Sequence, residues 1–78
     1  MKSYEECKEI AKKYVEDTVC TINSAYELPD AYVFDNSSEI YAGIVPFAVI
    51  KETGKVKDVW GYLEESNLTM DDMEEIEY

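Results

Sequence analysis

The chain has 78 residues, of which 46% are hydrophobic and 13% aromatic, so it has enough apolar bulk for one small core in one domain, residues 1–78. Its formal net charge of −11 opposes binding to nucleic acid or to an anionic membrane surface. The same charge either steers the chain towards a basic protein partner or serves solubility alone.

The cysteines and the N-terminal residues indicate the cellular compartment in which the protein is expected. The chain contains two cysteines, Cys7 and Cys20, and no histidine, which is too few ligands for a zinc site of its own. Residues 1–14 are charged and amphipathic and lack the apolar run of a signal peptide. We therefore expect a cytoplasmic protein with reduced thiols rather than a secreted protein with one disulfide. No apolar run reaches the roughly 20 residues of a membrane span.

The first expected element is an amphipathic helix that begins at Tyr4. Ser3 and Glu6 have the spacing of a capping box, in which each side chain accepts a hydrogen bond from the backbone amide of the other residue. Apolar side chains then recur at three- and four-residue spacing, with charged side chains mostly on the other side. The face predicted to be buried consists of Cys7, Ile10, Ala11, Tyr14, Val15 and Thr18.

Two strands are expected next. Residues 19–26 alternate in polarity and predict a first strand, which ends before Pro29 because proline lacks a backbone N–H. Residues 31–34 are aromatic and branched, and the turn-forming residues 35–38 come directly after them, which predicts a second strand. Residues 39–45 fit either a further strand or a short helical turn, and their conformation stays open.

The strongest local signal is a β-hairpin. The apolar runs 47–50 and 56–60 flank the sequence Lys-Glu-Thr-Gly-Lys of residues 51–55, and Gly54 suits a left-handed position in the turn. Because both faces of the hairpin carry apolar residues, we expect it near the middle of a sheet.

The expected register of this hairpin sets Lys51 opposite Lys55. Phe47 then lies opposite Val59, so these two side chains share one face of the sheet and Trp60 lies on the other face. The hairpin is thus predicted to extend to Trp60.

The C-terminal third predicts short helices. Residues 62–66 fit a short helical turn, and residues 70–77 fit a final helix capped by Thr69. Acidic residues near the end of that helix have the wrong sign for its dipole, so we expect it to fray unless it is held. The resulting fold class is α+β, with the N-terminal helix packed on a small antiparallel sheet of about four strands and a short C-terminal helix.

The sequence offers little for catalysis. Without histidine the chain lacks the usual general base near neutral pH. Cys7 falls on the apolar helix face and Cys20 in a predicted strand, so both fit buried structural thiols better than nucleophiles. We therefore expect a protein that is not an enzyme and that uses no metal or cofactor.

Tyrosine and acid supply the candidate binding residues. Seven tyrosines in 78 residues exceed what a core of this size is expected to hide, and tyrosine combined with acid suits a protein interface. For each ring, partial packing in the core is the competing interpretation. The predicted partner-binding residues are Tyr32, Tyr41, Trp60, Tyr62, Asp35, Glu39 and Asp58.

A second candidate surface is the acidic cluster of Asp71, Asp72, Glu74 and Glu75. It lacks the spacing and the glycine of a calcium loop, so a metal site is not expected there. The cluster fits a solvated face, or a mimic of nucleic-acid phosphates that occupies a basic groove.

One segment resembles a known family. From Gly43 the chain continues through Pro46, an apolar strand and a Lys-Glu-Thr-Gly-Lys-Val turn, and an aromatic strand, Tyr32-Val33-Phe34, precedes it. These features resemble the immunity protein 35 family of bacterial toxin systems. The resemblance implies a cytoplasmic, non-catalytic protein that binds and neutralises a cognate toxin, and the family supplies no motif-defined contact residues.

The hypothesis is therefore an immunity-type inhibitor that neutralises a basic protein toxin through an acidic, tyrosine-rich surface. The alternative is an acidic nucleic-acid mimic that inhibits a DNA-binding complex of the phage-defence type. Neither hypothesis involves direct binding to nucleic acid or to a membrane.

Overall fold

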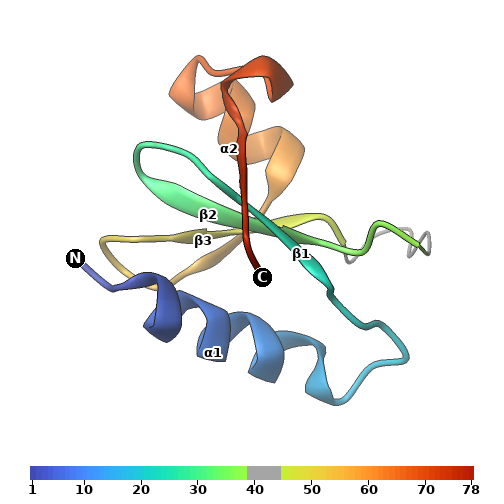
Figure 1. The fold of residues 1–78 in the computed structure, drawn as a ribbon. Helices are drawn as coiled ribbons and strands as arrows, with labels where there is room; N and C mark the ends of the chain where they lie inside the picture. Colours follow the sequence, from blue (N-terminus) through green and yellow to red (C-terminus); the bar gives the residue numbers. More distant parts are fainter. Residues whose placement is uncertain (39–44) are drawn as a thin grey trace.

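A computed structural model describes residues 1–38 and 45–78 of the chain and has an α+β fold, as predicted. Helix α1 covers one face of an antiparallel sheet and helix α2 covers the other (Figure 1). Within the described residues the sheet has five strands in the order β4-β3-β2-β1-β5, rather than about four. The helices are α1 (Tyr4–Glu16) and α2 (Val59–Ser66), and the strands are β1 (Ser24–Glu27), β2 (Ala31–Asp35), β3 (Phe47–Ile50), β4 (Val56–Asp58) and β5 (Glu74–Ile76).

Helix α1 begins as predicted. The Ser3 hydroxyl accepts from the Glu6 amide at 3.2 Å, and the Glu6 carboxylate accepts from the Ser3 amide at 3.1 Å. This second bond lowers the pKa of Glu6, so its contribution to stability is present above the ordinary carboxyl pKa and is lost as the pH falls through the lowered value. Cys7, Ala11 and Val15 are buried as predicted.

Two residues near the C-terminal end of α1 were predicted to be buried and are exposed. Tyr14 is 46% exposed, and its ring rests on that of Phe47 with the centroids 4.8 Å apart. Thr18 is exposed and turns the chain, because its hydroxyl donates to the Val15 carbonyl and accepts from the Cys20 amide. These local bonds compete with a strand, so β1 begins at Ser24 and not at residue 19.

Two apolar layers result from the alternation of side chains along the central strands. In β2, Phe34 packs in the α1 layer and Val33 in the α2 layer. Phe47 and Ala48 of β3 divide in the same way, as expected for a sheet covered on both faces.

The hairpin forms, but its register differs from the prediction by one residue. Ile50 is bonded across the turn to Lys55, and Phe47 lies opposite Asp58 instead of Val59. Such a shift moves side chains to the other face of the sheet. Val56 therefore joins the α1 layer, and Val59 joins the α2 layer.

The hairpin also lies elsewhere in the sheet than expected. Strand β4 is an outer strand and β2 is the middle one. Trp60 is not in a strand, because the Asp58 carboxylate accepts from the Gly61 amide at 3.0 Å and starts α2 at Val59.

Gly54 holds the turn with a φ of +77°, and a Cβ there would lie 2.6 Å from Lys2 Cε and 2.9 Å from Ile10 Cδ1. We expect Gly54→Ala to lower the free energy of unfolding by about 1–2 kcal/mol, measured by urea denaturation. Gly61→Ala is the matched control, since a Cβ there meets its nearest atom at 3.6 Å within a helix and should be neutral or stabilising. Equal stabilities of the two variants would contradict this account.

The C-terminal segment is a strand instead of the predicted helix. Thr69 caps the chain as expected, but the capped residues form only a single 3-10 turn, η1 (Met70–Asp72), in which the Asp72 backbone amide donates to the Thr69 carbonyl and the Asp72 carboxylate accepts from the Thr69 amide. Strand β5 then pairs antiparallel with β1, and Ile76 lies opposite Ala25 in the α1 layer. Pairing with β1 holds the acidic C-terminal residues in place. In a helix, their charge would oppose the helix dipole and the end would fray.

Candidate binding surface

The structure separates the predicted aromatic residues. Tyr32 packs in the α1 layer, with its ring centroid 5.1 Å from that of Tyr4 and 4.6 Å from Lys51 Nζ. Trp60 lies on α2, on the other side of the sheet, and is 55% exposed. These two rings therefore do not form one surface.

Tyr62 is the clearest departure from the sequence analysis, because it is buried. Its side chain is 4% exposed and packs in the α2 layer with Leu28 and Leu63. The hydroxyl has no hydrogen-bond partner among residues 1–38 and 45–78. The ring belongs to the core, as the competing interpretation held.

Removing this hydroxyl tests the assignment. We expect Tyr62→Phe to leave the free energy of unfolding unchanged or to raise it by up to about 1 kcal/mol, because a buried hydroxyl without a partner is costly. Urea denaturation measures the change, and Tyr14→Phe, whose ring is 46% exposed, serves as the control. Destabilisation by Tyr62→Phe beyond about 1 kcal/mol would show that the hydroxyl is bonded.

The predicted acidic contact residues have local structural roles. The Asp35 carboxylate accepts from the Asn36 amide at 2.7 Å, and Asp58 caps α2. Asp58 and Trp60 are both exposed at the start of α2. Tyr41 and Glu39 lie outside the described residues.

The acids of the C-terminal cluster are exposed, and they lack basic partners among the described residues. Asp71, Asp72, Glu74 and Glu75 are all exposed, and none of them forms an ion pair in the described part of the chain. Glu74 and Glu75 are neighbours in a strand, so they point to opposite faces of the sheet. The cluster therefore does not present one row of charge.

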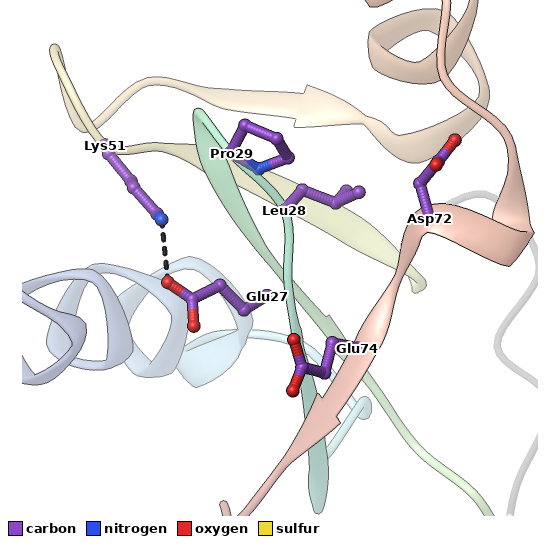
Figure 2. A pocket seen from close by; sticks show the side chains of 6 residues that line it. All are labelled: Glu27, Leu28, Pro29, Lys51, Asp72 and Glu74. Carbon is purple, nitrogen blue, oxygen red and sulfur yellow. Dashed lines mark hydrogen bonds and ion pairs between the residues drawn. The ribbon is translucent and has the colours of Figure 1, made fainter.

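A groove of about 440 Å³ opens beside the start of β5 (Figure 2). Lys51 Nζ lies 2.9 Å from the Glu27 carboxylate, and Glu27 lies directly opposite Glu74 in the β1–β5 pair. Three carboxylates and one ammonium line this groove, so it suits a cationic group better than an anion. The lining residues are Glu27, Leu28, Pro29, Lys51, Asp72 and Glu74.

Four residues of the groove were not predicted as site residues, and Lys51 is the most unexpected of them; the other three are Glu27, Leu28 and Pro29. The position of Lys51 in a polar turn predicts exposure, yet its side chain is only 11% exposed. Its backbone amide donates to Asp30 and its carbonyl accepts from the Lys2 amide. These partners are distant in sequence, so no local pattern could have indicated them.

The thiols are buried and free, as predicted. Cys7 is fully buried and Cys20 is 5% exposed. Burial raises the pKa of the Cys7 thiol, which disfavours the reactive thiolate. Within the described ranges, no three His, Cys, Asp or Glu side chains are grouped as metal ligands, and no helix is long and apolar enough to cross a membrane.

No protein-family model matches the chain, and neither a curated protein nor a solved structure matches it.

Proposed function

We propose that this chain is a non-catalytic binding protein of the immunity type, which neutralises a basic protein partner with an acidic surface. One observation carries the proposal: from Asp58 onward the chain has eight acidic residues and no lysine or arginine, and all eight acids are exposed. We call these residues the acidic surface: Asp58, Glu64, Glu65, Asp71, Asp72, Glu74, Glu75 and Glu77.

An aromatic side chain lies beside one residue of the acidic surface. Trp60 is 55% exposed and lies one helical turn before Glu64, so the ring and the carboxylate share a face of α2. Tryptophan dominates the energetics of many protein interfaces, and surrounding charge steers the encounter. Trp60 thus replaces the wider set of tyrosines as the proposed centre of contact.

Pairing within the chain neutralises little of this charge. Lys57 forms an ion pair with Glu65, and in the described ranges no other member of the acidic surface is paired with a basic side chain. The resemblance of residues 43–56 to the immunity protein 35 family points to the same class of function.

Affinity capture tests the proposal. The tagged chain is bound to a lysate of its source cell at about 0.15 M salt, where screening leaves only close charge contacts effective. We expect one basic protein to be retained, and co-expression of the chain to abolish that protein's toxicity. A retained basic protein whose toxicity is unaffected by the chain would contradict the immunity function.

The nucleic-acid mimic is the alternative outcome of this experiment. It would be favoured if the retained material were a DNA-binding complex that competing duplex DNA displaces. The opposite orientations of Glu74 and Glu75 are less suited to that function, because phosphate mimicry requires charge along one face.

A further inference from the structure

The outer edge of β5 is the feature that the proposed function leaves unused. Strand β5 is last in the sheet order, and in the described ranges its single strand neighbour is β1. An outer strand exposes backbone N–H and C=O groups that an added strand can bond. We propose that β5 binds an extended basic segment of the partner as a sixth strand; this inference rests on the proposed function and specifies its binding mode.

Both ends of β5 are held in place. At its start, the Thr69–Asp72 capping box fixes η1. At its end, Lys8 Nζ donates to the Tyr78 carbonyl and lies 4.3 Å from the centre of the Tyr78 ring, which also contacts Phe34. An edge that is ordered before binding loses less entropy when a partner strand is added.

The side chains of β5 specify the chemistry of the added strand. Ile76 points into the α1 layer, whereas Glu75 and Glu77 flank it in the chain and are exposed. Cross-strand neighbours share a face, so the matching strand places an apolar side chain beside Ile76 and basic side chains beside the two glutamates. Because this basic-apolar-basic pattern reads the same in both directions, it fits parallel and antiparallel addition alike.

The groove provides a second reason to expect a cationic partner. Glu74 lies directly opposite Glu27, and like charges in that position are destabilising. Lys51 compensates Glu27 through its ion pair, but Glu74 has no basic partner in the described part of the chain (Figure 2). A further lysine or arginine in the added strand, two positions from its apolar residue, would lie opposite Glu74 and relieve this repulsion.

The opposite edge of the sheet differs in chemistry. Strand β4 carries Lys57, and lysine on an outer strand discourages further pairing. On β5 the acids repel other copies of this chain, whose net charge is −11, while they attract a basic strand. The edge is therefore selective for a partner of opposite charge.

Peptide binding to the full chain tests the inference. The probe is the short capped peptide Lys-Lys-Val-Lys-Lys, titrated by calorimetry at low and at moderate salt. We expect it to bind and to slow hydrogen exchange at residues 74–76. The control peptide has the same sequence with N-methyl groups on alternate backbone nitrogens, made in both registers, and it should bind roughly tenfold more weakly or worse because it loses backbone bonds.

Charge variants of the chain give an independent readout. The double variant Glu75→Gln, Glu77→Gln should weaken binding of the peptide, whereas Glu16→Gln, Glu52→Gln removes the same charge at exposed positions away from β5 and should not. Equal losses in the two variants would mean that only net charge matters, and would overturn strand addition.

The remaining outcomes separate this inference from the proposed function. Equal binding of methylated and unmethylated peptides, or exchange protection outside β5, would overturn strand addition and leave an acidic binding surface in place. No binding of either peptide would also overturn it, and affinity capture would then decide the proposed function alone. Concentration-dependent self-association that the peptide competes away would assign the edge to a second copy instead of a basic partner.

Discussion

Phe34→Ala is expected to lower the free energy of unfolding by about 3–5 kcal/mol, which is most of the stability of a small domain. Phe34 is fully buried in β2, the middle strand, and its ring lies between those of Tyr4 and Phe47 at centroid distances of 6.1 Å. Truncation would open a cavity where α1 meets the sheet. Urea denaturation followed by tryptophan fluorescence measures the loss.

A matched substitution separates volume from ring geometry. Phe34→Leu keeps most of the volume, so it should cost under about 1.5 kcal/mol. A loss below about 1 kcal/mol for Phe34→Ala would contradict a close-packed α1 layer, because it would mean that the layer collapses around the gap.

The parts of the fold that were predicted correctly depend on neighbours in sequence. The capping box at Ser3 and Glu6 needs only a three-residue spacing, and Gly54 is needed where the turn demands a positive φ. Strand β2 was predicted from its run of aromatic and branched residues, which are enriched in strands because they fit a pleated, partly buried surface.

The parts that were predicted wrongly depend on distant contacts. Residues 70–77 have a capped start and a helical spacing of apolar residues, yet pairing with β1, about fifty positions earlier in the chain, makes a strand instead. The hairpin register differs for a local reason instead: Ile50 is bonded to Lys55 across the turn, which sets the pairing, and the Asp58 carboxylate caps α2, which ends β4.

The residues of the candidate surface were likewise predicted correctly in part and wrongly in part. The composition indicates more tyrosines than a core of this size can bury, but it cannot tell which rings face outward. Tyr62 was therefore predicted to lie on the surface, whereas the structure buries it in the core. Trp60 was predicted as a contact residue and is exposed, although in a helix rather than a strand. The exposure of the C-terminal acids could be expected from their charge alone.

Neutralising part of the acidic surface is expected to slow association with the basic partner by about 10- to 100-fold, while dissociation changes little. The variant replaces exposed acids that neither cap a backbone amide nor pair with Lys57: Glu64→Gln, Asp71→Asn, Glu75→Gln and Glu77→Gln. Surface plasmon resonance at several salt concentrations measures both rates. Glu16→Gln, Glu52→Gln is the control, and an equal slowing per charge would reduce the effect to net charge.

Trp60→Ala should have the opposite kinetic signature. Loss of a buried aromatic anchor costs about 2 kcal/mol or more, so dissociation should accelerate by about 30-fold, with little change in association. Trp60 is exposed in the free chain, so the substitution should leave the free energy of unfolding within about 0.5 kcal/mol. If the acids serve solubility alone, neither variant will change binding. A binding surface, by contrast, requires the acids to act on association and the tryptophan on dissociation, because steering and anchoring are physically separate contributions to one interface.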